Sequence, residues 1–183
     1  MIDLQNGIFL IANPSLDDPH FFKSVVLLCA HNDEESIGFI INKKTKYVLS
    51  ELVPELSQCH LPVFEGGPVA LNTLHIVHQY PDKISNSLHV KDDIYWGGDF
   101  TDVIRLIDSG MYNAAQIKFF VGYSGWGKNQ LEEEQKEPSW IVADINTATI
   151  FQTDERIIWK DVLLKLGGGH ELLINAPIDP QWN

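Results

Sequence analysis

Apolar residues fall in short, nearly continuous runs in the first half of the chain, and polar or turn-forming residues separate them. Runs of this kind predict buried β-strands, because both faces of such a strand are covered. The polar stretch 31–36 lies between two of the runs and predicts a hairpin loop. The predicted strands cover residues 8–12, 24–30, 37–41, 73–78 and 117–121.

In other parts of the chain the apolar residues are spaced as on one face of a helix, which predicts helices there. Four apolar residues share one face of the stretch 99–108, and Gly110 is a natural stop after it. The other predicted helices cover residues 48–52, 131–136 and 156–166.

Residues 140–143 and 149–151 are predicted to pair as two strands around Asn146 and Thr147.

The order of these elements favours one fold class. Strands cluster and helices are inserted among them without strict β-α-β alternation, which predicts a single mixed α+β domain rather than a doubly wound sheet. We place this domain at residues 1–169. The remaining 170–183 form a C-terminal tail with Pro177 and Pro180, which we expect to be loosely held.

Charge narrows the classes of partner. The 183 residues carry a formal net charge of −12, and the only basic cluster, 43–46, is expected to be a solvated loop. Because phosphate contacts need clustered Lys and Arg, direct nucleic-acid binding is not expected. A protein partner or a small ligand of unknown identity fits the composition better.

The cysteine and histidine residues do not indicate a metal site or another cofactor. Cys29 lies in an apolar run and Cys59 in a polar turn, which gives neither a disulfide scaffold nor a zinc site. His75 and His78 would point to opposite faces of a strand, so a metal pair is not expected. Without a signal peptide or membrane span, the expected location is the cytoplasm.

The stretch 122–131 carries the most candidate chemistry. It combines three glycines, two aromatics and Gln130 in a predicted strand-to-helix turn. Gly122 to Asn129 nearly matches a phosphate-binding loop, but Asn129 stands where a magnesium-binding hydroxyl is required, which favours an accidental match. The stretch also nearly matches a nucleophile elbow, but Trp126 stands where a tiny residue is needed, which favours a structural Ser124. An enzyme, a nucleotide hydrolase or another hydrolase using this turn, is the alternative to a binding protein.

These segments together resemble the bacterial YqgE/AlgH family. Order and spacing agree over about residues 7–167, and the most specific block is 122–127 with Gln130, Leu131 and Glu134. Ser124 stands where the family usually has Ala, and Lys128-Asn129 stands where the family is variable. Further matching segments are 7–14, 22–26, 38–42 with His31, 66–69, Trp140, Trp159 and 166–167.

The resemblance implies an α+β fold with a bifurcated sheet that curls toward a barrel, with helices packed on it. It implies no established enzymatic activity, and some members are labelled as transcriptional regulators. Because the chain is acidic, regulation through a protein partner fits better than direct DNA binding.

From the residues and the resemblance together, we predict a binding surface where two Gly-rich turns meet. Tyr123 and Trp126 would supply apolar contacts, and Gln130 and Asn42 directional hydrogen bonds. The second turn would expose backbone amides. The full predicted set is Asn13, His31, Asn42, Gly66, Gly67, Pro68, Tyr123, Trp126 and Gln130, with no catalytic residue and no metal ligand.

Overall fold

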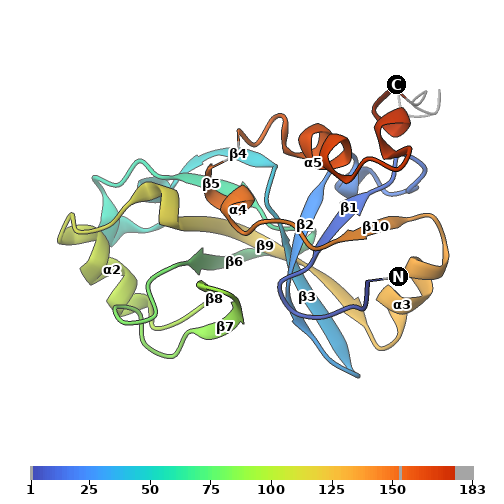
Figure 1. Cartoon of the computed structure of the whole chain (residues 1–183). Helices are drawn as coiled ribbons and strands as arrows, with labels where there is room; N and C mark the ends of the chain where they lie inside the picture. The colour runs from blue at the N-terminus through green and yellow to red at the C-terminus, as the bar shows by residue number, and fades with distance from the viewer. Residues whose placement is uncertain (1, 153, 176–183) are drawn as a thin grey trace.

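The computed structural model of the chain describes residues 2–152 and 154–175 (Figure 1). A large β-sheet runs through the molecule, and helices pack on it. The strands are β1 (Phe9–Ala12), β2 (Val25–His31), β3 (Glu35–Ile40), β4 (Lys44–Val48), β5 (Pro62–Glu65), β6 (Val69–His78), β7 (Leu88–Lys91), β8 (Ile94–Trp96), β9 (Ile117–Gly127) and β10 (Trp140–Ala143).

Five α-helices connect or cover these strands in the described residues, together with short 3₁₀ helices. No helix there is long and apolar enough to cross a membrane. The α-helices are α1 (Leu49–Leu52), α2 (Phe100–Asp108), α3 (Gln130–Lys136), α4 (Ala148–Gln152) and α5 (Ile158–Leu166), and the 3₁₀ helices are η1 (Pro19–Phe21), η2 (Pro54–Leu56), η3 (Ala114–Gln116) and η4 (His170–Asn175).

The sheet is open, with strand order β10-β1-β2-β3-β9-β6-β8-β7. Every pairing along this path is antiparallel, and β5 joins β9 as a parallel branch that also carries β4. Closure would require β10 and β7 to hydrogen-bond, but these strands lie at opposite ends of the sheet (Figure 1). The single α+β domain is therefore as predicted, whereas the expected curl toward a barrel is wrong.

Strand β9 is the branch point of the sheet. Its first half pairs with β5 and β6, and its last residues pair with β3, where Gly125 lies opposite Ile37 and Gly127 opposite Glu35. The predicted turn over 122–131 is therefore mostly strand. The true turn is short, and Asn129 takes a left-handed conformation (φ 59°) immediately before α3.

The predicted pairing of 140–143 with 149–151 is also wrong. Strand β10 pairs with β1 instead, with Phe9 opposite Ala143 and Ala12 opposite Trp140. The second segment belongs to α4, where the Asn146 side chain accepts a hydrogen bond from the Ala148 amide (2.8 Å). A side-chain acceptor at this position satisfies one of the free amides at a helix start.

Most other predicted elements are present within a few residues of the expected bounds. Sequence reasoning missed β4, β5, β7 and β8, which are short and partly exposed. The basic cluster expected as a loop lies largely on β4. At the C-terminus, η4 packs Leu173 and Ile174 against the core, and 176–183 lie outside the described residues.

Apolar side chains form three buried clusters around the sheet. The largest includes α5 side chains, and the second lies beneath α1, η2 and α2. The third joins β1, β2 and β10 to Trp126 and Leu131, at the end of the molecule that carries α3 (Figure 1). This third cluster forms the base of the candidate site.

Candidate functional site

The two Gly-rich segments lie against each other. The Gly66 amide donates to the Val121 carbonyl (2.9 Å), and the Ser124 hydroxyl donates to the Gly66 carbonyl (2.9 Å). A Cβ on Gly67 would overlap the backbone of Tyr123 and Ser124, so only glycine permits this approach. The buried Ser124 hydroxyl thus ties the two segments together.

A cleft of about 460 Å³ opens beside this junction. Its walls come from segments far apart in sequence: the loop before and including η1, the residue after Gly67, the end of β9, α3 and the start of β10. The lining residues are Ser15, Leu16, Asp17, Asp18, Phe21, Pro68, Gly125, Trp126, Gln130, Glu134, Glu137, Ser139 and Trp140.

Glu134 organises the floor of the cleft. Its Oε2 accepts hydrogen bonds from the indole N–H groups of Trp126 (2.9 Å) and Trp140 (2.7 Å). Its Oε1 accepts from the Gln130 side chain (3.0 Å), one helical turn earlier on α3. Hydrogen bonds to a carboxylate are among the stronger ones in proteins, so this carboxylate fixes both rings.

Three aromatic rings pack beneath the cleft. Phe21 lies 5.2 Å from Trp140 and 6.2 Å from Trp126, and the two indoles are 6.0 Å apart. These centroid separations are those of rings in direct contact. Trp126 and Trp140 are only 4% and 6% exposed. A ligand would therefore lie on this aromatic cluster and not between its rings.

The lining is acidic. Four carboxylates, those of Asp17, Asp18, Glu134 and Glu137, face the cleft, and among the described residues no Lys, Arg or His lines it. Asp18 accepts a hydrogen bond from the His20 amide (2.8 Å) and Glu134 is bound to the indoles. Asp17 and Glu137 are exposed, and neither side chain forms a hydrogen bond within the described part of the chain.

The structure brings some of the predicted site residues together. Pro68, Trp126 and Gln130 line the cleft, and Gly66 and Gly67 support it from behind. Gln130 also accepts the Gly127 amide (3.0 Å), which closes the turn into α3. Asn13 does not line the cleft itself. Its side chain accepts a hydrogen bond from the backbone amide of Ser15 (3.0 Å), which does line the cleft.

Three predicted site residues lie elsewhere. Tyr123 packs beside His75 (5.8 Å) against a different core cluster from Trp126. The His31 ring contacts the Ser36 hydroxyl (2.8 Å), with Glu132 at 3.8 Å. Asn42 links two backbone segments, accepting from the Val25 amide (2.8 Å) and donating to the Lys23 carbonyl (2.9 Å).

The phosphate-loop alternative is not supported by the backbone. A loop of that kind must wrap amides around a phosphate, whereas Tyr123 to Gly127 is strand paired with β3 and β6. The Lys128 amine reaches Glu34 (2.7 Å) on the surface. Within the described residues, no cluster of three His, Cys, Asp or Glu side chains is placed to bind a metal ion.

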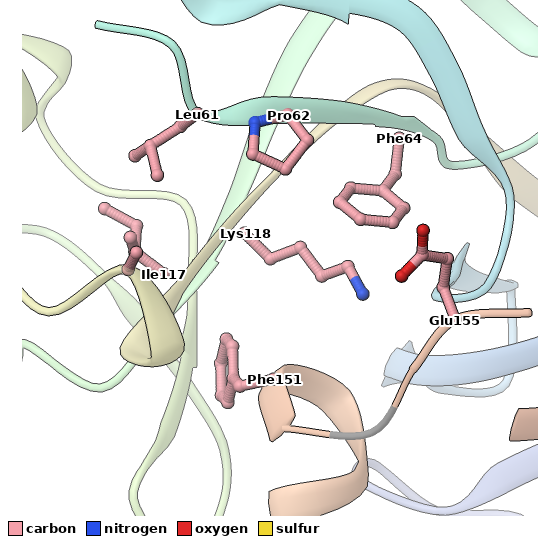
Figure 2. A pocket seen from close by; sticks show the side chains of 8 residues that line it. Leu61, Pro62, Phe64, Ile117, Lys118, Phe151 and Glu155 are labelled. Carbon is pink, nitrogen blue, oxygen red and sulfur yellow. The ribbon is translucent and has the colours of Figure 1, made fainter.

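A second pocket, of about 210 Å³, contains a group that sequence reasoning missed (Figure 2). Lys118 of β9 is 7% exposed, and its amine donates to the carbonyls of Ile41 (2.7 Å) and Ile150 (3.0 Å). The nitrogen lies 3.9 Å from the centre of the Phe64 ring. The other lining residues are Leu61, Pro62, Ala114, Ile117, Phe151 and Glu155.

Desolvation dominates the titration of Lys118. Burial lowers the pKa of its ammonium from 10.5 to about 7, and the negative charge of Glu155 opposes that shift. Within the described residues Lys118 forms no ion pair. One signal was available in the sequence: this lysine interrupts an otherwise apolar strand at 117–121.

The open sheet and the cleft describe an α+β protein with a ligand-sized acidic cleft beside its Gly-rich strand. The AlgH-like family model matches residues 9–171, so the chain belongs to the AlgH-like family. A UPF0301 protein of Cytophaga hutchinsonii is 42% identical over 181 residues, which cover 98% of this chain and all of that protein. The family predicted from sequence is confirmed.

Solved structures agree with this assignment. The solution structure of the AlgH protein from Pseudomonas aeruginosa is similar, with a TM-score of 0.74 and 25% identity over 97% of each chain. A crystal structure of a protein from Corynebacterium diphtheriae matches with a TM-score of 0.78 over 94% of this chain and 92% of that one, at 18% identity, which shows the shared fold alone.

Proposed function

We propose that this protein is an interaction protein whose cleft binds a positively charged segment of a partner protein. The observation that carries the proposal is the lining of the cleft, which has four carboxylates and, among the residues that the structure describes, no basic side chain above an aromatic floor. Its volume of about 460 Å³ is in the range of ordinary ligand sites. Lys or Arg side chains suit such a lining, because they combine an apolar stem with a charged head.

The positions of the carboxylates support a defined binding mode. The stem of the basic residue would lie on Leu16, Pro68 and the edge of Phe21, and its charged head would meet Asp17 and Glu137. Since Glu134 already accepts three hydrogen bonds, it serves to hold the rings and not to bind the partner directly.

The charge of the chain supports a protein partner over nucleic acid. A net charge of −12 repels phosphate, and it attracts basic protein segments and speeds their encounter. A role in transcriptional regulation, the label that some family members carry, would then run through a protein contact, which suits the expected cytoplasmic location.

Binding of short labelled peptides, followed by fluorescence anisotropy, tests the proposal. We compare a lysine-containing peptide with peptides in which norleucine or glutamate replaces each lysine. Norleucine keeps the apolar stem and removes the charge. We expect the lysine peptide to bind, norleucine to weaken binding strongly, and glutamate to abolish it. Equal binding of the lysine and norleucine peptides would contradict a charge-selective cleft.

A pair of variants with matched charge locates the site. Asp17→Asn with Glu137→Gln removes two charges from the cleft, and Glu55→Gln with Asp82→Asn removes two exposed charges elsewhere. We expect the first pair to weaken binding about five- to tenfold, from typical energies of exposed ion pairs. The second pair should leave binding within about twofold. Equal weakening by both pairs would reveal only general attraction to an acidic protein and would refute the cleft.

A further inference from the structure

The pocket around Lys118 differs from the acidic cleft in composition. Its walls are mostly apolar: Leu61, Pro62 and Phe64 lie on one side, and Ile117 and Phe151 on the other, with Glu155 beside the lysine nitrogen (Figure 2). At about 210 Å³ it is smaller than ordinary ligand pockets and suits a small molecule. Lys118 is the only basic residue that lines it among the described residues.

The contacts of the amine decide what it offers to a ligand. Two of its hydrogens are donated to the carbonyls of Ile41 and Ile150. When the amine is neutral these two bonds use both of its N–H groups, so the lone pair is left for another partner. An anion is a poor partner, because two carbonyl oxygens already contact the nitrogen and the negative charge of Glu155 lines the same pocket.

Burial also favours the neutral form. An ordinary lysine is neutral in only on the order of one molecule in a few thousand at pH 7. Desolvation brings the Lys118 pKa to about 7, so about half of the molecules carry a neutral amine at that pH. A desolvated lysine amine in an apolar pocket is a nucleophile suited to carbonyl compounds.

We propose that Lys118 is a carbonyl-binding amine, and that its pocket admits a small, uncharged apolar aldehyde. The Nζ lone pair attacks the carbonyl carbon to form a carbinolamine, and loss of water then leaves an imine. Amine and aldehyde thus give imine and one water, with no change of oxidation state. Glu155, which lines the same pocket, takes the proton from nitrogen and returns it to the departing hydroxyl.

Reductive trapping of the native protein tests this inference. The protein is incubated at pH 7 with butanal and sodium cyanoborohydride, and labelled lysines are identified by peptide mass mapping. We expect Lys118 to be labelled at least about tenfold faster than the exposed Lys160 and Lys165. Unfolding the protein in urea should abolish this preference, because the pocket is lost.

Two further arms separate reactivity from a purely structural role. Glu155→Gln should slow labelling of Lys118 severalfold while the labelling of Lys160 is unchanged. The anionic aldehyde glyoxylate should label Lys118 less than butanal does, because Glu155 and the carbonyls repel it. Labelling of Lys118 no faster than that of Lys160 in the native protein, or a preference that survives unfolding, would overturn the inference. These readouts are independent of the acidic cleft.

Discussion

The acidic cleft and the Lys118 pocket each contain a partly or fully buried ionisable side chain, and the surrounding groups satisfy it in opposite ways. In the cleft, the Glu134 carboxylate meets two indole N–H groups and an amide, all of them donors that match its charge. In the second pocket, the Lys118 amine meets two carbonyls and an aromatic face, with no ion pair in the described part of the chain.

The consequences differ. Donors that converge on a carboxylate fix the Trp rings and leave the outer acids, Asp17 and Glu137, available to a partner. Neutral acceptors around an ammonium do not offset its desolvation, so the charge of Lys118 becomes sensitive to pH near neutrality. In the two roles that we propose, the cleft would serve charge recognition and the second pocket a change of protonation.

The largest expected effect concerns the floor of the cleft. Trp126→Ala removes a ring that is only 4% exposed and should lower the free energy of unfolding by about 3–5 kcal/mol, measured by urea denaturation. Trp126→Phe keeps much of the ring packing and should lower it less. A loss below about 1 kcal/mol for the alanine variant would show that Trp126 is not part of the core.

A pH series tests the second pocket. Below about pH 7 both folded and unfolded states carry the Lys118 charge, and the folded state bears the full penalty of burial. Between about pH 7 and 10.5 the unfolded state binds the proton more tightly, so stability rises with pH by up to about 1.4 kcal/mol per unit.

Lys118→Met removes this contribution. We therefore expect the unfolding free energy of the wild-type protein minus that of the variant to increase as pH rises from 7 to 10. Subtraction cancels the other titrating groups, which both proteins share. A difference that stays constant, or that falls with pH, would contradict a desolvated Lys118.

A smaller effect is expected at the carboxylate of the cleft. Glu134→Ala leaves the two indole N–H groups without their acceptor and should cost about 1–3 kcal/mol of stability. Glu134→Gln keeps an acceptor oxygen and should cost less. If the two variants are equally destabilised in thermal and urea unfolding, the indole hydrogen bonds are not the source of the effect.

The smallest effect is expected at the apparent phosphate loop. Lys128 pairs with Glu34 on the surface, so Lys128→Ala should change stability by less than about 1 kcal/mol. Calorimetry with Mg-ATP and Mg-GTP should detect no micromolar binding to the wild-type protein. Binding that disappears in the Lys128 variant would instead support a nucleotide site.

Sequence patterns predicted the elements that local residues determine. The apolar runs gave β1, β2 and β3, and the spaced apolar face with Gly110 gave α2. The sequence patterns failed where contacts with segments far away in the sequence determine the secondary structure. Glycines are rare in strands, so 122–127 suggested a turn, yet pairing of Ser124 to Gly127 with β3 keeps most of this segment in the strand. Residues 149–151 favour strands by composition, yet they lie in α4, whose first amide is satisfied by the Asn146 side chain.

The residues of the candidate site also fall into those that the sequence predicted and those that it did not. Trp126, Gln130 and Pro68 were predicted because two Gly-rich segments stood out in the sequence. Asp17, Phe21 and Glu137 were not, because they reach the cleft from segments whose positions depend on the whole sheet. The strand register also explains why Tyr123, only three residues before Trp126, packs in another cluster.

The most direct test of the acidic cleft is a ¹⁵N NMR titration of the wild-type protein with the lysine peptide. The indole N–H signals of Trp126 and Trp140 report the cleft, and that of Trp159, which donates to the Ala12 carbonyl (2.8 Å), is an internal control. We expect the first two signals to shift saturably while the third stays in place. Saturable binding that moves neither Trp126 nor Trp140 would place the partner elsewhere and contradict the account.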